Sequence, residues 1–282
     1  MNALPFVKME GAGNDYVYVD AIRHAFPWPR AAELARRWSD RHFGIGADGL
    51  IVLSRDDDGA LRMSMWNGDG SRGAMCGNGL RCIAKLAVDH GHAGVGRMTI
   101  RTDGGERVAI HLGGCGEDPA AATIRTEMGV VHVGSARTID VGGRAVEYVP
   151  GDAGNPHAVV FVADVECADV HGLGAAMQTH PDFPDGVNVE FVRVVAPDRI
   201  RQRTFERGSG ETLACGTGAA AVSAVARQLG RVIGDKISVE LRGGVLTVLL
   251  GGSSLAIEGS ARTVFEGVIR LDGGPGVPAS NL

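Results

Sequence analysis

The chain has 282 residues, of which 44% are hydrophobic and 22% charged, a balance typical of an ordinary globular protein. This length predicts one large or two medium-sized domains. A formal net charge of -5 argues against nucleic acid or an anionic membrane surface as a partner. No apolar run approaches the roughly 18 residues needed to span a bilayer, and residues 1–8 lack the basic and apolar regions of a signal peptide.

Five cysteines, an odd number at irregular spacing, favour free thiols and a cytoplasmic location over a disulfide framework. Two of them, Cys76 and Cys215, stand directly before glycine-rich turns that lead into helical patterns. The remaining three have no partner motif, and we interpret them as structural: Cys82, Cys115 and Cys167.

In the first half of the chain, apolar alternation and turn residues predict strands at 6–9, 16–19, 50–53, 63–66, 98–102 and 107–112. Helical spacing predicts helices at 31–41 and 80–89. The acidic run Asp56-Asp57-Asp58 is interpreted as a solvated hairpin turn, because no further metal ligands lie near it in the sequence.

The glycine-rich stretch 113–121 is the best candidate for a domain boundary. After it we expect strands at 123–128, 145–149, 158–162, 187–192, 201–206, 236–241, 246–250, 255–258 and 268–271, with helices at 165–177 and 219–229. The second helix is apolar nearly all round, which predicts a buried central helix. The tail 273–282 is rich in Gly, Pro and Ser and is expected to be disordered.

Landmarks recur along the chain at a nearly constant offset, which predicts two copies of one ancestral domain. Cys76 and Cys215 are 139 positions apart, as are Asn67 and Glu206. Two dipeptides recur in the same order, Gly13-Asn14 with Gly154-Asn155 and Asp48-Gly49 with Asp185-Gly186. A pseudo-twofold axis would place the two cysteine turns opposite each other.

This arrangement suggests proton transfer at a carbon atom. A helix N-terminus favours a thiolate over a thiol, so a thiolate and a thiol on opposite faces of one carbon can invert it. The N–H groups of Gly77-Asn78 and Gly216-Thr217 are placed to bind a carboxylate. The alternative is that both cysteines are buried packing residues, but their matching positions in a repeat favour the catalytic interpretation.

The same residues resemble the diaminopimelate epimerase family over about residues 6–271. The matching motifs are Met9-Glu10-Gly11-Ala12-Gly13-Asn14-Asp15, Gly44-Ile45-Gly46-Ala47-Asp48-Gly49, Asn67-Gly68-Asp69-Gly70-Ser71, Met75-Cys76-Gly77-Asn78-Gly79, Gly154-Asn155-Pro156-His157, Val187-Asn188, Glu206-Arg207-Gly208-Ser209-Gly210-Glu211-Thr212 and Ala214-Cys215-Gly216-Thr217-Gly218.

The resemblance implies an α+β fold of two pseudo-symmetric domains, each a mixed sheet or barrel wrapped around a central helix. We expect the domains at 1–120 and 121–263, with a C-terminal strand at about 264–272 rejoining the first. The resemblance also implies epimerisation of LL-2,6-diaminopimelate to the meso form, a step toward lysine and peptidoglycan precursors, without pyridoxal phosphate or metal. Cys76 and Cys215 match the acid and base, and a homodimer is implied, with Phe265 near an aromatic that relatives use there.

Further residues are assigned to the substrate through this resemblance. Arg207 would bind the distal carboxylate and Glu206 an ammonium group. Glu206 and His157 would also tune a cysteine pKa, although His157 is equally well explained as a core histidine. Four amides offer both a donor and an acceptor to a zwitterion, although any one alone is also a turn-former: Asn14, Asn67, Asn155 and Asn188.

Two positions depart from the family pattern, since many relatives carry Gln at Gly49 and often an acidic residue at Arg72. One alternative is therefore another cofactor-independent racemase or epimerase of the same fold, acting on proline derivatives or histidine. Arg207 discriminates, because a substrate without a distal carboxylate has no use for it. An alternative from another class is a non-enzymatic redox or thiol-binding protein that uses Cys76 and Cys215.

Overall fold

The computed structural model describes residues 3–251 and 254–271, so the predicted disordered tail lies outside the described residues. The chain divides into two compact units. Unit 1 comprises residues 1–124 and 260–282, and unit 2 comprises residues 125–259.

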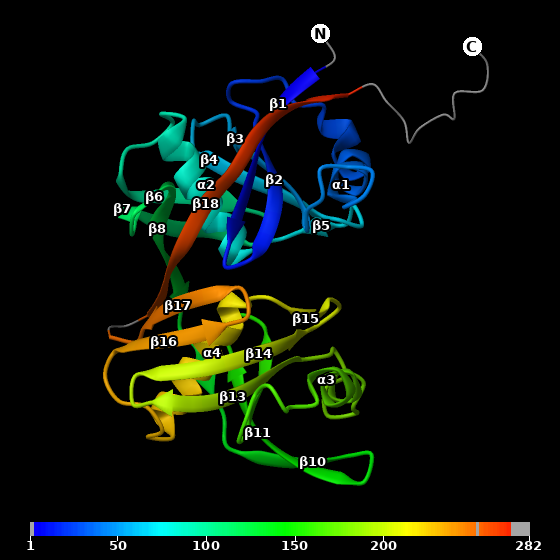
Figure 1. Ribbon diagram of the computed structural model, residues 1–282, viewed down its shortest axis with the longest axis vertical. Coiled ribbons are helices and arrows are strands. Elements are labelled where there is room, and N and C mark those ends of the chain that lie inside the picture. The colour runs from blue at the N-terminus through cyan, green and yellow to red at the C-terminus, as the bar shows by residue number, and fades with distance from the viewer. Residues whose placement is uncertain (1–2, 252–253, 272–282) are drawn as a thin grey trace, which may run out of the picture. The chain divides into compact units, whose positions relative to one another are not determined.

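Unit 1 contains the strands of the N-terminal part of the chain, three helical segments and the C-terminal part of the last strand (Figure 1). Its elements are β1 (Ala3–Gly11), β2 (Asn14–Asp20), η1 (Trp28–Arg30), α1 (Ala31–Ser39), β3 (Gly49–Arg55), β4 (Leu61–Asn67), β5 (Arg72–Gly73), α2 (Gly77–Asp89), β6 (Gly96–Thr102), β7 (Gly105–Cys115) and the first part of β8 (Asp118–Gly129).

Unit 2 follows with the same kinds of element in the same order. They are β9 (His132–Val133), β10 (Arg137–Val141), β11 (Arg144–Asp152), β12 (Pro156–Phe161), α3 (Val170–Gln178), β13 (Asn188–Ala196), β14 (Arg199–Glu206), β15 (Gly210–Thr212), α4 (Gly216–Gln228), β16 (Lys236–Leu241), β17 (Gly244–Leu249) and the first part of β18 (Leu255–Arg270).

Strand pairing repeats between the units in both partner and direction. In unit 1, β2 pairs parallel with β3, β3 antiparallel with β4, β4 parallel with β6 and β6 antiparallel with β7. In unit 2, β12–β13, β13–β14, β14–β16 and β16–β17 reproduce these four pairings in the same directions. The predicted pseudo-symmetric architecture is confirmed.

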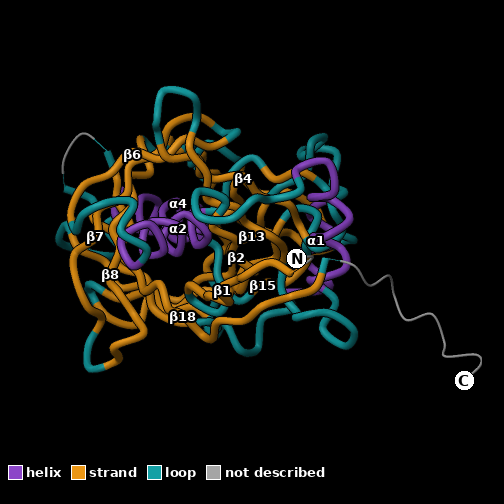
Figure 2. Tube along the Cα trace, turned by 90° about the horizontal axis from the view of Figure 1, so that it is seen from above, coloured by secondary structure: helices purple, strands orange, loops and turns teal. Residues whose placement is uncertain are grey.

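One long helix lies inside the strands of each unit, α2 in unit 1 and α4 in unit 2 (Figure 2). Ten of the 13 residues of α2 and eight of the 13 of α4 are buried, which requires apolar or small side chains around most of each helix. The run Ala219-Ala220-Ala221-Val222 meets that requirement with small side chains, so strands can approach it closely on several sides.

The division between the units lies at residues 124/125, just beyond the predicted stretch 113–121, and the two predicted C-terminal strands are parts of one strand. Residues 113–121 contain the end of β7, a turn and the start of β8, with Gly113 and Gly116 at positive φ. Strand β8 continues across residues 124–125, so a strand rather than a loop leads from unit 1 to unit 2. Residues 255–258 and 268–271 belong to the 16-residue strand β18, apart from Leu271, and β18 pairs with β17 and then with β1 (Figure 1).

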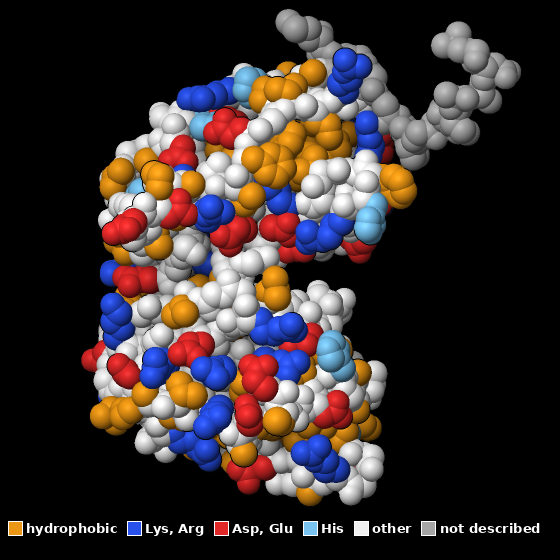
Figure 3. Space-filling view, in the orientation of Figure 1, with side chains coloured by type: hydrophobic (Ala, Val, Ile, Leu, Met, Phe, Trp, Pro, Cys, Tyr) orange, Lys and Arg blue, Asp and Glu red, His pale blue; other side chains and the backbone are white. Residues whose placement is uncertain are grey.

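Among the described residues, no helix has the length and apolar character that crossing a membrane requires. Acidic and basic side chains are interspersed on the face seen in Figure 3, in keeping with the small net charge.

Gly49 provides a test of how tightly β3 and β4 approach each other. A Cβ atom at this position would lie 2.2 Å from the Trp66 carbonyl oxygen and 2.9 Å from Tyr16 Cε1. We expect Gly49→Ala to destabilise unit 1 by about 1–3 kcal/mol, as overpacking does. All three tryptophans lie in unit 1, so unfolding in guanidinium followed by tryptophan fluorescence reports on this unit.

The matched control is Gly94→Ala, because Gly94 is exposed and a Cβ there has no neighbour within 4 Å. Equal unfolding midpoints for Gly49→Ala and Gly94→Ala would contradict this prediction. They would show that β3 and β4 can move apart around the added methyl group without loss of stability.

Candidate active site

Each central helix begins with a cysteine whose sulfur caps the first turn. Cys76 is the N-cap residue of α2, with φ -135° and ψ 121°, and its Sγ accepts the Gly79 N–H at 3.5 Å. Cys215 is the N-cap residue of α4, with φ -118° and ψ 109°, and its Sγ accepts the Gly218 N–H at 3.3 Å. The remaining N–H groups of the first turn face the same end of the helix, which is suited to anions: those of Gly77, Asn78, Gly216 and Thr217.

The glycine three residues after each cysteine lets the helix start lie against a strand. A Cβ on Gly79 would be 2.5 Å from Ile51 Cδ1, and one on Gly218 would be 2.5 Å from Glu190 Oε1. Ile51 and Glu190 occupy equivalent positions, on β3 and β13 respectively. The two helix starts therefore share one backbone design but rest on an apolar side chain in unit 1 and a carboxylate in unit 2.

In unit 1, the half-site contains Cys76, Asn14 and Tyr16. The Cys76 thiol donates to Asn14 Oδ1 at 3.2 Å, and Asn14 Nδ2 donates to Asp48 Oδ2 at 2.6 Å. The Tyr16 hydroxyl is also hydrogen-bonded to Cys76, and burial raises the pKa of Tyr16 far above its ordinary value. Tyr16 is thus a neutral phenol next to the sulfur.

Asp48 fixes the position of Asn14 through a charged network. Its Oδ2 also accepts the Asp15 N–H at 3.0 Å, and Arg41 forms ion pairs with both Asp15 and Asp48. Lys8 completes the network by an ion pair with Asp15. Asp48 and Tyr16 were not predicted to belong to the site, although each is hydrogen-bonded to a residue that was, Asp48 to Asn14 and Tyr16 to Cys76.

In unit 2, the half-site is more acidic. Cys215 Sγ lies 3.4 Å from Thr217 Oγ1 and is hydrogen-bonded to Glu206, whose Oε1 also accepts the Thr212 hydroxyl at 2.6 Å. Burial raises the pKa of Cys215 well above its ordinary value, and the nearby carboxylates of Glu206 and Glu190 raise it further. The expectation that a helix N-terminus favours a thiolate is wrong for Cys215, because burial and two carboxylates outweigh the helix end.

Behind Cys215 lies a buried network around Glu190, which is fully buried. Glu190 Oε1 is 2.8 Å from His157 Nδ1, and His157 Nε2 is 3.0 Å from Asn155 Oδ1. Glu190 Oε2 accepts from Gln202 Nε2 at 2.7 Å and from the Thr204 hydroxyl at 2.5 Å. Sequence reasoning missed Glu190, although a charged residue inside the apolar run 187–192 was a usable signal.

Cys215, His157 and Glu190 each present a possible metal ligand, and these atoms lie within 4.8 Å of one another. Both Glu190 oxygens already accept hydrogen bonds, two of them from groups that are not metal ligands. This buried set is therefore better suited to proton transfer and positioning than to a resident metal.

The other residues predicted to bind substrate differ in burial and in their hydrogen-bond partners. Asn188 is buried and joins Pro156 O to the Arg207 N–H, which is a structural role. The Arg207 side chain is exposed, with Nη1 3.1 Å from Asp185 O. Asn78 is buried and accepts from Arg81, whereas Asn67 donates to Ser71 Oγ at 2.9 Å.

Arg72, one departure from the family pattern, has partners of its own. Its guanidinium lies 4.2 Å from the Trp66 ring centroid and 2.5 Å from Asp103 Oδ2. These contacts hold the guanidinium over the Trp66 ring of β4 and beside Asp103. Arg72 is thereby explained by packing and ion pairing.

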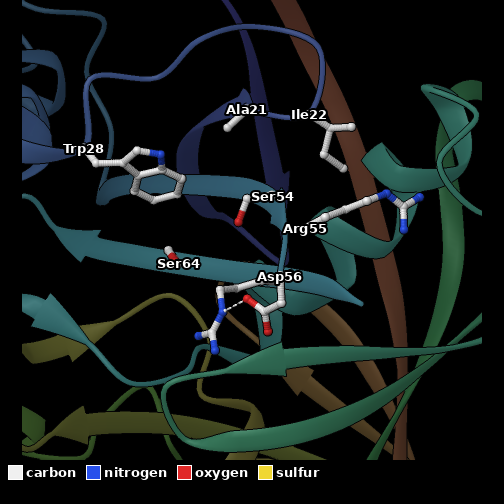
Figure 4. Close-up of a pocket in the computed structure, with 8 residues that line it drawn as sticks. Ala21, Ile22, Trp28, Ser54, Arg55, Asp56 and Ser64 are labelled. Atoms are coloured by element: carbon white, nitrogen blue, oxygen red, sulfur yellow. Dashed lines mark hydrogen bonds and ion pairs between the residues drawn. The ribbon is translucent and has the colours of Figure 1, made fainter. Parts of the chain in front are cut away.

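A separate hollow of about 530 Å³ lies on unit 1 and contains neither cysteine (Figure 4). It is lined by Ala21, Ile22, Trp28, Ser54, Arg55, Asp56, Arg62 and Ser64. Arg62 Nε is paired with Asp56 Oδ1 at 2.5 Å inside it. Asp56 and Arg62 are thus engaged with each other, and Arg55 donates to the Gly59 and His92 carbonyl oxygens, so we do not assign this hollow to the substrate.

Comparison with known proteins decides the family. The model of the diaminopimelate epimerase family matches residues 6–132 and 151–260. The chain belongs to the diaminopimelate epimerase family. Similar family members include diaminopimelate epimerases of Desulfovibrio desulfuricans, 40% identical over 94% of this chain and 98% of the relative, and of Aromatoleum aromaticum, 41% identical over 96% and 100%.

Solved structures agree with this epimerase in fold alone. A PhzF-family phenazine biosynthesis protein of Bacillus anthracis has a TM-score of 0.73 at 14% identity, covering 95% of this chain and 99% of that one. A hydroxyproline epimerase from Agrobacterium vitis has a TM-score of 0.66 at 18% identity, covering 96% and 94%. Family membership makes this epimerase an isomerase by class, and the resemblance predicted from the sequence is confirmed.

The environment of Cys215 leads to a prediction about its reactivity. Since the Glu206 carboxylate raises the pKa of Cys215, Glu206→Gln should lower that pKa, and the thiolate should then form at a lower pH. Iodoacetamide should then modify Cys215 faster at a fixed neutral pH, as measured by peptide mass spectrometry over a pH series.

Glu166→Gln, which neutralises an exposed carboxylate of the same unit, is the control and should leave the profile unchanged. If the rate of Cys215 modification depended on pH in the same way in Glu206→Gln and in the unaltered chain, the Glu206 charge would have no effect on the thiol and the prediction would be wrong.

Proposed function

We propose that this protein interconverts LL- and meso-2,6-diaminopimelate, with Cys76 and Cys215 as the two acid–base groups and with neither pyridoxal phosphate nor metal. The observation that carries the proposal is the matched pair of sulfurs, each capping the buried central helix of its repeat. Membership of the diaminopimelate epimerase family supplies the substrate.

Protons balance in this scheme. Cys76, as a thiolate, takes the proton from the α-carbon, and the electron pair of the broken C–H bond stays on that carbon. The Cys215 thiol then delivers its proton to the opposite face and becomes the thiolate. After turnover Cys76 is the thiol and Cys215 the thiolate, the form that catalyses the reverse reaction.

The surroundings of the two sulfurs support this starting assignment. Glu206 and Glu190 oppose negative charge on Cys215, so Cys215 begins as the proton donor. Beneath the start of α2, Ile51 stands where unit 2 has Glu190. Cys76 is therefore assigned as the first base.

Charge that develops on the substrate needs preorganised donors. The first-turn N–H groups of α2 and α4 are such donors, since they are directed along the helix axis and move little during the reaction. We assign them to the carboxylate next to the reacting carbon. Cys76 and Cys215 are the N-cap residues of these two helices.

At the distal end of the substrate, Arg207 is the proposed carboxylate ligand. Its side chain is exposed, and its contact with Asp185 O leaves other guanidinium donors for a bidentate pair. Glu206 has two proposed roles, binding an ammonium and tuning Cys215, and its contact with Cys215 favours the second. Asn14 and Asn155 remain proposed substrate ligands from the two half-sites.

A racemase of proline derivatives is the second candidate, favoured only by the fold that this chain shares with a hydroxyproline epimerase. A coupled assay with LL- and meso-diaminopimelate, proline and histidine decides between them. Turnover of diaminopimelate alone is expected. Turnover of proline or histidine without diaminopimelate would replace the proposal with the second candidate.

Single removal of each sulfur tests the two-base scheme. Cys76→Ala and Cys215→Ala should each lower epimerisation by at least about 10²–10⁴-fold, the usual worth of a positioned acid or base. With β-halogenated substrate analogues, whose carbanions expel halide without a second acid, the two variants should prefer opposite stereoisomers. Halide release measured for both isomers gives the answer.

Arg207→Ala is the matched control in that assay, since it alters binding outside the reacting centre and should mainly raise KM. If both cysteine variants favoured the same isomer, one residue would perform all proton abstraction and the two-base scheme would be wrong.

We also propose a homodimer formed through β18 of unit 1. Val264, Phe265 and Val268 are 45%, 45% and 67% exposed on this strand, and an apolar area overlies β1 and β18 in Figure 3. Phe265 stacks edge-on against Phe6 with ring centroids 5.8 Å apart, which keeps one side of the ring outward. Such an apolar strip is suited to a second copy of the chain.

Phe265→Asp should shift sedimentation from dimer to monomer, because it places a charge in the apolar contact. Ile233→Asp, which alters an equally apolar and 62% exposed residue of unit 2, is the control and should leave the dimer intact. A Phe265→Asp protein that sediments as the unaltered chain would exclude this surface.

A cytoplasmic location is the remaining proposal. All five cysteines are free thiols, including Cys167, which is exposed. Free and exposed thiols persist where the compartment is reducing. Fractionation of cells producing the chain would test the location directly.

A further inference from the structure

Outside the proposed active site, three side chains of unit 1 converge at the far end of α2. Asp20 Oδ2, at the end of β2, lies 2.7 Å from His90 Nδ1 and 2.7 Å from His92 Nε2. The three ligand atoms lie within 4.8 Å of one another. In the described part of the chain, this cluster and the Cys215 cluster are the two groups of His, Cys, Asp and Glu that meet this criterion.

All three side chains are held in place by backbone contacts. Asp20 Oδ1 accepts from the Ile22 and Arg23 N–H groups, which leaves Oδ2 directed at the histidines. His90 is the C-cap of α2, and the His92 N–H donates to Ala87 O at 2.7 Å. Gly91, with φ +72°, makes the turn that brings both imidazoles to the same carboxylate oxygen.

Two arginines hold the backbone of this turn from outside. Arg23 Nη2 donates to His90 O, and Arg55 Nη2 donates to His92 O at 3.0 Å. In Figure 4 the Arg55 side chain extends away from Trp28. Both guanidinium groups are thus engaged with carbonyl oxygens, although Arg23 Nε is also 3.7 Å from Asp20 Oδ2.

We propose that Asp20, His90 and His92 form a binding site for a divalent transition-metal ion that prefers imidazole, such as Zn²⁺, Co²⁺ or Ni²⁺. Two imidazoles and one carboxylate are a donor set that such ions take, with the remaining position left to water. The Asp20 side chain is 2% exposed, whereas those of His90 and His92 are 19% and 11% exposed. The carboxylate is therefore buried under two imidazoles through which solvent, and an ion, can reach it.

Metal binding changes the proton on each ring. In the hydrogen-bonded cluster, His90 Nδ1 and His92 Nε2 carry the hydrogens directed at Asp20. The ion takes the place of these hydrogens, so each neutral ring moves its proton to its other nitrogen, and a charged ring releases one.

The site would tie together the two elements that carry the unit 1 half-site. Strand β2 runs from Asn14 to Asp20, and α2 follows Cys76 and ends at Asp89, next to His90. The Asn14–Cys76 hydrogen bond joins them at one end, and the proposed site joins them at the other. A bound ion would stabilise unit 1 by mass action.

The test is a calorimetric and absorbance titration of the full chain with Co²⁺, after removal of metal by a chelator that is then dialysed away. The unaltered chain should bind one equivalent of Co²⁺, and this binding should raise the midpoint temperature of thermal unfolding. His92→Gln should weaken this equivalent by at least about 100-fold, since a change outside the ligand shell already costs about 10–100-fold. His132→Gln, which alters an exposed histidine of unit 2, should leave it unchanged.

Nuclear magnetic resonance of the histidine ring nitrogens with Zn²⁺ keeps the test independent of variant folding. Two of the nine histidines should change tautomer on addition of one equivalent, and they should be absent from spectra of His90→Gln and His92→Gln respectively. The proposal is overturned if His92→Gln binds Co²⁺ as the unaltered chain does, if no such equivalent binds, or if the rings that respond are others, such as His157.

Discussion

A sulfur atom that accepts a first-turn N–H of a buried helix is the contact on which this structure depends. It occurs in both units, between Cys76 and Gly79 and between Cys215 and Gly218. An enclosed helix cannot satisfy its first N–H groups with bulk water, so something at the end of the helix must accept them. A cysteine in that place satisfies one donor and leaves the other first-turn N–H groups available to an anion.

The repeat fixes the backbone around each sulfur but leaves the neighbouring side chains free to differ. Tyr16 pairs with Gly49 across β2 and β3, and His157 pairs with Asn188 across β12 and β13. Ile51 and Glu190 differ in the same way beneath the helix starts. Duplication followed by such changes yields two sulfurs in one backbone geometry with different electrostatic surroundings.

Glycine placement shows how narrowly the two half-sites are packed. Gly79 and Gly218 allow the helix starts to rest on Ile51 and Glu190, and Gly49 lets β3 approach the Trp66 carbonyl. A side chain at any of these positions would collide with its neighbour at 2.5 Å or less. The departure at Gly49 is therefore a feature of strand packing as well as of any substrate contact.

The sequence by itself determined the elements and their duplication. Apolar periodicity, the glycine turns after Cys76 and Cys215, and the offset of 139 residues are local or one-dimensional signals, and they indicated the central helices, the repeat and the family. The sequence also predicted residues that the structure brings together within a unit, such as Asn14 with Cys76 and Glu206 with Cys215.

Only the tertiary structure decided what depends on burial and on residues distant in the chain. Cys215 has a raised pKa because strands carrying Glu190 and Glu206 enclose it, and burial opposes its ionisation more strongly than the helix end favours it. The stretch 113–121 looked like a linker because its glycines favour turns, yet the flanking strands β7 and β8 continue through most of it. Asp20 and His92 are 72 positions apart, and no sequence spacing indicates that they share one oxygen. Local preferences set helices, strands and turns, whereas charge and ligand geometry depend on which side chains packing brings together.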